Sequence, residues 1–215
     1  MSNTNTLAQS LDAYIACFDA SWQRDAPLEQ VRFVVLDCET TGLDARRHRI
    51  ISIGGVSVSQ CEIDLGDTFE ALLQVRFNTY ATLVHGITRD QTRAGMDESE
   101  AIARLLTYLR DGVIVGHHIG HDLAMIDAAL GRHSDGQLLN RHIDTGELVQ
   151  RLLLDGALED RAPPKDLSLD SMCAVFGVLP YGRHTAPGDA FLTAQIFLRL
   201  LRIAKRSGRG TLDQL

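Results

Sequence analysis

The sequence is poor in cysteine, proline and long apolar runs, and each shortage excludes a class of protein. The four cysteines among 215 residues form no CxxC pair or other metal-ligand spacing, and a chain of this length buries a sizeable core without disulfides. Only 5 prolines and a hydrophobic content of 45% exclude collagen-like, low-complexity and wholly disordered chains. No stretch reaches the roughly 18 apolar residues of a membrane span, and the N-terminus lacks the pattern of a signal peptide. We therefore expect a soluble, cytoplasmic protein with no membrane association.

Positive charge is also in short supply, because 21 Lys and Arg face 28 Asp and Glu, which gives a formal net charge of −7. This balance argues against a protein that coats nucleic acid by bulk charge, but not against an enzyme that handles nucleic acid through metal ions held by acids. Aromatic residues make up only 6%, which argues against a long stacking platform for single strands. Two basic clusters stand apart, each of which is either a phosphate contact or a solvated face. They are Arg46–Arg49 and the set Arg199, Arg202, Lys205, Arg206 and Arg209.

The hydrophobic pattern predicts strands first and then alternating strands and helices. Residues 31–36 are rich in branched and aromatic side chains, which is typical of a strand that enters a core. Two more strands follow closely and suggest an antiparallel meander, after which the spacing becomes helical. This order favours an α/β sandwich around a mixed sheet. The expected strands are 31–36, 49–58, 67–76, 113–115 and 141–144, and the expected helices are 97–110, 121–132, 145–154, 167–176 and 187–206.

The pattern divides the chain into a main domain and two short appendages. Residues 1–30 form an N-terminal extension, in which apolar residues at helical spacing predict an amphipathic helix over 7–23. Residues 31–206 form the main domain, and 207–215 form a tail that we expect to fray. The N-terminal helix either packs on its own domain or makes a dimer contact, and the sequence does not fix the oligomeric state.

Acidic residues recur where core elements begin or end. Asp37 and Glu39 follow the first strand, and positions i and i+2 of an extended chain point to one side. Two carboxylates at the end of an apolar strand favour a bound hard cation such as Mg²⁺ or Mn²⁺. Asp122 opens a helix, and Asp189 lies at the start of the long helix with His184 in the loop before it. Each feature alone also fits a structural role, namely a solvated turn, a helix cap or an acid that complements a helix dipole.

Taken together, four acids and a loop histidine match the requirements of two-metal phosphodiester hydrolysis. Such ions neutralise charge on the phosphate and orient a water molecule, and a histidine with a reference pKa of about 6.5 suits proton transfer near neutrality. A second interpretation uses His118 and His121, whose i, i+3 spacing would place two imidazoles on one zinc ion if the segment is helical. That interpretation leaves the acids after the first strand unexplained.

Three motifs in order resemble the DEDDh 3′–5′ exonucleases, the DnaQ-like group that includes the proofreading epsilon subunit of bacterial DNA polymerase III. Residues 37–42 match the family's D-x-E-T-T-G, Gly116–Asp122 correspond to its second motif, and His184–Asp189 match its H-x-x-x-x-D. The resemblance extends over residues 31–204. It implies a ribonuclease H-like three-layer fold, with a mixed five-stranded sheet flanked by helices and here preceded by an N-terminal helix.

The resemblance also implies roles for individual positions. The ligands of two Mg²⁺ or Mn²⁺ ions would be Asp37, Glu39, Asp122 and Asp189, with His184 as the general base. The loop after the first motif and the H-G-I segment would line the pocket for the 3′-terminal nucleotide. The substrate contacts are then Thr40, Leu43, His85 and His118. The family usually has Asn where this chain has His118 and Phe where it has His121, so substrate grip and pH optimum are where this chain would differ.

The function implied is a metal-dependent 3′–5′ exonuclease that removes nucleoside monophosphates from single-stranded or frayed DNA 3′ ends. One alternative is an RNA 3′–5′ exonuclease of the same family, because a 2′-OH contact cannot be read from one sequence. Another is a non-catalytic module that binds nucleic acid or a polymerase. The expected partners are a nucleic acid 3′ end, with single-stranded DNA favoured over RNA, and a polymerase or repair complex.

Overall fold

The computed structural model describes residues 3–75, 86–158 and 163–215. A five-stranded mixed sheet runs through the middle of the molecule, in the order β3-β2-β1-β4-β5. The strands β1, β2 and β3 form the expected antiparallel meander, whereas β4 pairs in parallel with both β1 and β5. The strands are β1 (Phe33–Thr40), β2 (Ile50–Ser59), β3 (Glu62–Leu72), β4 (Val113–Gly116) and β5 (His142–Asp144).

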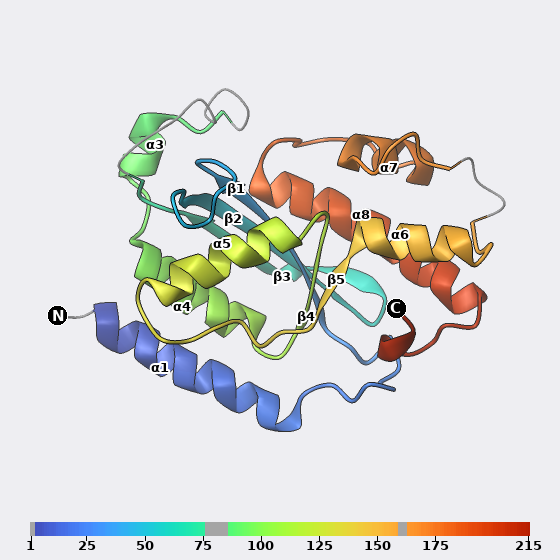
Figure 1. The fold of residues 1–215 in the computed structure, drawn as a ribbon, viewed down its shortest axis with the longest axis horizontal. Helices are drawn as coiled ribbons and strands as arrows, with labels where there is room; N and C mark the ends of the chain where they lie inside the picture. The colour runs from blue at the N-terminus through green and yellow to red at the C-terminus, as the bar shows by residue number, and fades with distance from the viewer. Residues whose placement is uncertain (1–2, 76–85, 159–162) are drawn as a thin grey trace.

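Helices cover both faces of the sheet (Figure 1). One face carries α1 (Asn3–Ala16), α4 (Glu98–Leu109) and α5 (Gly120–Gly131), and the other carries α6 (Thr145–Leu154), α7 (Leu169–Phe176) and α8 (Ala186–Arg206). Alternate residues of β1 separate the two cores, since Val34 and Leu36 pack beneath the first set of helices and Phe33 and Val35 beneath the second. The three-layer fold that the sequence implied is therefore confirmed. Within the described residues, no helix combines the length and apolar character needed to cross a membrane.

The boundaries of three elements differ from the sequence expectations. The N-terminal helix occupies Asn3–Ala16 and then tightens into a 3-10 turn, Cys17–Ala20, instead of spanning 7–23. Strand β1 continues to Thr40, so Asp37 and Glu39 lie within the strand, because its pairing with β2 persists past them. Strand β3 spans Glu62–Leu72 rather than 67–76, and most of its side chains are exposed. An edge strand of this kind lacks the apolar signal by which buried strands are recognised. A short helix that the pattern did not predict, α3 (Arg89–Arg93), precedes α4.

Both ends of the described chain pack on the main domain. Tyr14 of α1 is 1% exposed, and its hydroxyl accepts the backbone N–H of Leu139 at 2.7 Å. The C-terminal tail forms a 3-10 turn, Leu212–Gln214, in which Leu212 is buried, and Leu215 is only 5% exposed. The expectation that the tail frays is therefore wrong, because its leucines complete the core beneath α8. The division of the chain at residues 30 and 206 stays a prediction.

Candidate active site

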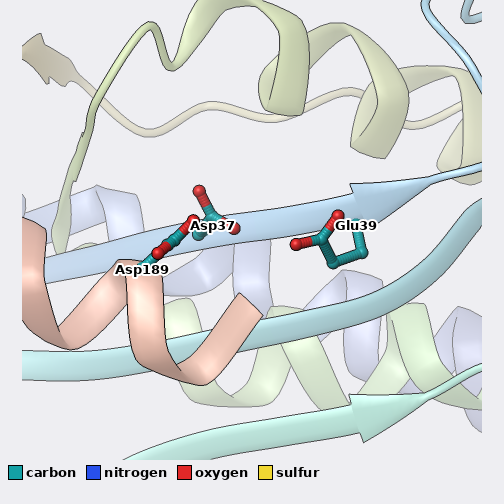
Figure 2. Close-up of side chains that lie close together, drawn as sticks. All are labelled: Asp37, Glu39 and Asp189. Atoms are coloured by element: carbon teal, nitrogen blue, oxygen red, sulfur yellow. The ribbon is translucent and has the colours of Figure 1, made fainter. Parts of the chain in front are cut away.

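Three acids converge where β1 ends and α8 begins. Asp37 and Glu39 project from β1 towards Asp189 in the first turn of α8 (Figure 2). One carboxylate oxygen from each lies within 4.8 Å of the other two. The Oδ1 atom of Asp189 is buried and finds no hydrogen-bond partner in the described parts of the chain. A buried, unpartnered carboxylate oxygen beside two further acids is an arrangement that a hard divalent cation stabilises, so these residues fit a metal site.

A glycine in β2 allows α8 to approach the sheet this closely. Gly54 pairs with Asp37 across the β1–β2 ladder, and a Cβ atom at Gly54 would lie 2.2 Å from backbone atoms of Ala186 and Pro187. No larger residue fits there unless the helix moves. As expected, α8 begins here with the proline in its first turn, and the structure adds that Thr185 is its N-cap. Sequence analysis missed the role of Gly54, although a Gly-Gly pair inside a strand of buried branched residues is a visible signal.

The first turn of α5 brings Asp122 to β1. Its Oδ1 accepts the backbone N–H of Cys38 at 2.8 Å, between the two acids of the strand. The N-cap position of α5 belongs to Ile119, so the hypothesis that Asp122 caps this helix is wrong. Asp122 is not one of the three acids whose oxygens lie within 4.8 Å of each other. Its assignment as a fourth metal ligand stays a prediction.

Burial and mutual repulsion disfavour negative charge at this point. Burial, followed by the charges of Asp122, Asp189 and Glu39, raises the pKa of Asp37 well above its usual range. Burial and then Asp189 raise the pKa of Glu39 to about 7. Burial also raises the pKa of Asp122 to about 7, although the N–H of Cys38 opposes that shift. Several acids with raised pKa values in one place are typical of a functional site rather than of a structural ion pair.

A cation that sequence analysis missed also reaches the acids. The guanidinium of Arg183 donates to Asp189, and its Nε donates to Asp170 of α7 at 2.7 Å. Burial disfavours the charged form, but the two acids raise the pKa of Arg183 above its ordinary value. The available signal was its position, directly before the histidine of the third motif.

His184 ends the loop before α8, with its side chain exposed and its backbone in a left-handed conformation (φ 62°). Together with Asp37, Glu39 and Asp189 it lines a cavity of about 550 Å³. The remaining lining residues include His117, His118, Arg183 and the segment 166–169. The candidate base and the three converging acids therefore face one shared cavity, which is the space that a substrate phosphate would need.

The expected substrate contacts occupy different surroundings. The hydroxyl of Thr40 donates to the backbone oxygen of Gly42 at 3.1 Å. Leu43, in the loop after β1, is 86% exposed, so its side chain is available to a ligand. His118 lines the cavity. His85 lies outside the described residues. Contact of these side chains with nucleic acid stays a prediction.

The two histidines of the zinc interpretation turn to separate partners. His118 Nε2 lies 3.1 Å from the backbone oxygen of Leu167, and His121 Nε2 lies 3.4 Å from Thr40 Oγ1. In residues 3–75, 86–158 and 163–215, the group of potential metal ligands contains neither histidine. The geometry therefore does not support a zinc site built on this pair. Burial lowers the pKa of His121, which favours the neutral form of its ring.

The two basic clusters differ in how far their charges are already used. In the loop between β1 and β2, the side chains of Arg46 and Arg47 are exposed, and Arg47 makes one loose pair with Asp44 at 3.4 Å. At the C-terminus, Lys205 pairs with Glu29 and Arg209 pairs with Asp155. In the part of the chain that the structure describes, both clusters thus keep cations that are not paired with an acid, and phosphate contact by either cluster stays a prediction.

The exonuclease family model RNase_T matches residues 34–197. The chain belongs to this exonuclease family. The resemblance to the DnaQ-like exonucleases is thereby confirmed. A DNA polymerase III of the PolC type from Thermotoga petrophila is 29% identical over 193 residues, which cover 89% of this chain and 13% of that protein. A DNA polymerase III subunit epsilon-like protein from Rhodobacter capsulatus is 30% identical over 195 residues, which cover 87% of this chain and 26% of that protein.

Solved structures share the fold at low sequence identity. E. coli exonuclease I in complex with a dT13 oligonucleotide superposes with a TM-score of 0.70 and 17% identity, over 83% of this chain and 43% of that one. A zinc-bound form of an E. coli exonuclease I complex with single-stranded DNA gives a TM-score of 0.69 and 20% identity, over 84% and 42%. The chain therefore spans less than half of these nucleases, and 13% and 26% of the two curated relatives.

Proposed function

We propose that this chain is a metal-dependent 3′–5′ exonuclease that removes nucleoside monophosphates from single-stranded or frayed DNA 3′ ends. The observation that carries the proposal is the convergence of Asp37, Glu39 and Asp189 within 4.8 Å, with one buried oxygen of Asp189 left without a partner. Membership of the exonuclease family supports the reaction class. Structural neighbours bound to DNA oligonucleotides support a single-stranded substrate.

The acids supply the ligand set for two Mg²⁺ or Mn²⁺ ions, namely Asp37, Glu39, Asp122 and Asp189. When bound, such ions provide positive charge for the phosphate and lower the pKa of a water molecule. The protein's contribution is positional, because the ligands come from β1 and from the first turns of α5 and α8. Elements packed on one sheet hold their carboxylates in fixed places, which favours a reactive geometry.

His184 acts as the general base in this proposal. It lines the same cavity as the acids, and its side chain is exposed and so accessible to a water molecule in that cavity. The imidazole takes a proton from the attacking water, whose oxygen bonds to phosphorus as the bond between phosphorus and the 3′ oxygen of the penultimate nucleotide breaks. The 3′ oxygen takes up a proton from solvent and leaves as a hydroxyl. The products are a nucleoside 5′-monophosphate and a strand that is one nucleotide shorter.

A turnover assay tests this directly. A 5′-labelled single-stranded DNA is incubated with the chain in Mg²⁺, in Mn²⁺ and in EDTA, and the products are resolved at single-nucleotide resolution. We expect a ladder that shortens one nucleotide at a time from the 3′ end in either metal and no change in EDTA. The same assay with RNA of identical sequence measures sugar preference.

Three outcomes would contradict the proposal in different ways. Faster shortening of RNA than of DNA would favour the RNA exonuclease. Binding without turnover in either metal would favour the non-catalytic module. Turnover that survives EDTA would remove the metal site from the mechanism.

A further inference from the structure

Arg183 links the acid cluster to a carboxylate outside it. The guanidinium donates to Oδ2 of Asp189 through Nη1, while its Nε donates to Oδ1 of Asp170 at 2.7 Å. Only 18% of the Arg183 side chain is exposed, so these contacts are not a loose surface pair. The side chain of Asp170 is 64% exposed. The guanidinium therefore extends from a solvated acid on α7 into the candidate metal site on α8.

Arg183 and a metal ion would use the same carboxylate. Oδ1 of Asp189 has no hydrogen-bond partner in the described chain, whereas Oδ2 accepts from Arg183 and lies 3.4 Å from the backbone nitrogen of His184. A divalent cation on Asp189 places two positive charges beside the guanidinium and repels it. The contact with Asp170 uses a different nitrogen, so Arg183 can lose Asp189 and keep Asp170.

We propose that Arg183 sets the metal affinity of this site by competing with the divalent ion for Asp189, while Asp170 retains the displaced guanidinium. The inference rests on the proposed function only in taking Asp189 as a metal ligand. When an internal competitor occupies a ligand group, only the molecules in which that group is free can bind the ion. The apparent affinity for the ion is therefore the intrinsic affinity multiplied by the free fraction. Removal of the guanidinium therefore strengthens metal binding, whereas removal of a residue that helps to hold the ion would weaken it.

Mn²⁺ binding without nucleic acid tests the competition, because the free ion is measured directly by electron paramagnetic resonance. The full chain is compared with Arg183→Gln and with Arg199→Gln as a matched control. Arg199 lies on the same helix as Asp189 but donates to the backbone oxygen of Gln195, so its substitution removes one positive charge and no contact with the acids. We expect the Kd for Mn²⁺ to fall at least about fivefold in Arg183→Gln. The control should change it less than about twofold, because salt screens distant charges.

Equal changes of the Mn²⁺ Kd in the two variants would mean that only the overall charge matters, which would overturn the proposal. Weaker Mn²⁺ binding by Arg183→Gln would overturn it as well.

Thermal unfolding in EDTA and in saturating Mn²⁺ separates competition from a purely structural role. In EDTA, Arg183→Gln should unfold at a lower temperature than the unaltered chain, because the acids lose a compensating charge. In Mn²⁺ the gap should narrow, because the bound ion supplies that charge.

A gap of the same size under both conditions would assign Arg183 a structural role and overturn the proposal. Nuclease activity of the unaltered chain is measured in a separate assay. Absence of turnover combined with the expected Mn²⁺ results would count against the proposed function and leave the competition standing.

Discussion

Two groups of partly buried acids in this molecule have pKa values shifted in opposite directions. Glu98, at the start of α4, receives two hydrogen bonds from Arg132 at 2.7 and 2.9 Å and lies 3.0 Å from His133. Burial opposes the charge of Glu98, but these partners lower its pKa below the usual value. Asp37 and Glu39, on β1, are also only partly exposed, yet burial and neighbouring carboxylates raise their pKa values.

The difference shows how a structural acid is distinguished from a functional one. A carboxylate that is paired with its own cations is already compensated, and removing one partner destabilises the folded chain because the other charge is left unpaired. A buried carboxylate surrounded by other carboxylates destabilises the folded chain unless a cation from outside joins it. The cluster at β1 and α8 belongs to the second kind, with Arg183 as a partial compensation.

The largest expected effect is the loss of turnover when one of the acids at β1 and α8 is neutralised. Asp37→Asn removes a charge but keeps the size of the side chain, so metal binding and turnover should fall together, with turnover at least about 10³-fold lower. The melting temperature in EDTA should stay level or rise, because one repelling charge is gone. Both are measured on the same preparation, by the single-strand assay and by circular dichroism. Strong Mg²⁺-dependent cleavage by Asp37→Asn would mean that the acids are not the active site.

Gly54→Ala tests whether the acids act through their convergence rather than their mere presence. An added Cβ would meet the backbone at the start of α8 and push Asp189 away from Asp37. A displacement of about 1 Å is expected to lower turnover about 100-fold while every acid remains in the chain. Gly131→Ala is the control, because a Cβ there meets nothing within 4 Å. Equal activity of the two variants would show that the position of α8 is not critical.

Much of this site could be predicted from the sequence because its residues follow local rules. The i, i+2 spacing of Asp37 and Glu39 places them on one side of a strand, and Pro187 marks the helix start that precedes Asp189. Gly54 and Arg183 could not be assigned in this way. Their roles depend on how α8 packs against β2 and α7, which is a long-range contact that no periodicity records.

Neutralising Glu98, the acid that is paired with Arg132 and His133, is expected to change stability rather than turnover. Glu98→Gln leaves the partly buried Arg132 with a neutral partner, which should lower the free energy of unfolding by about 2 kcal/mol. Turnover should remain unchanged, because α4 contributes no side chain to the cavity at the acids. Urea unfolding at pH 7 measures the first quantity and the single-strand assay the second. If Glu98→Gln stabilised the chain, as we expect for Asp37→Asn in EDTA, the distinction between the two groups would fail.

The smallest expected effect is the pH dependence of stability in EDTA. The pKa values of Glu39 and Asp122 are raised from 4.5 and 3.8 to about 7, so between about pH 4 and pH 7 the unfolded chain releases protons that the folded chain keeps. Their contribution to stability is therefore full below pH 4 and is lost as the pH rises towards 7. Glu98 contributes in the opposite sense, since its lowered pKa gives stability that is lost as the pH falls. His117 also opposes the trend of the acids with raised pKa values, because burial and the charge of His118 lower its own pKa.

Because these contributions have opposite signs, the stability-versus-pH curve of the unaltered chain alone does not isolate Glu39. The curves of two variants must be compared with it. Urea unfolding of the unaltered chain and of Glu39→Gln is measured in EDTA from pH 5 to pH 8. Glu39→Gln cannot ionise at this position, so its stability relative to the unaltered chain should increase with pH and level off above pH 7. Glu98→Gln, measured in parallel, should keep a nearly constant deficit over this range, because the lowered pKa of Glu98 confines its pH dependence to below about pH 4.5. Parallel curves for the unaltered chain and Glu39→Gln would mean that water or a flexible side chain already relieves the charge at β1, and the two groups of acids would then differ in geometry alone.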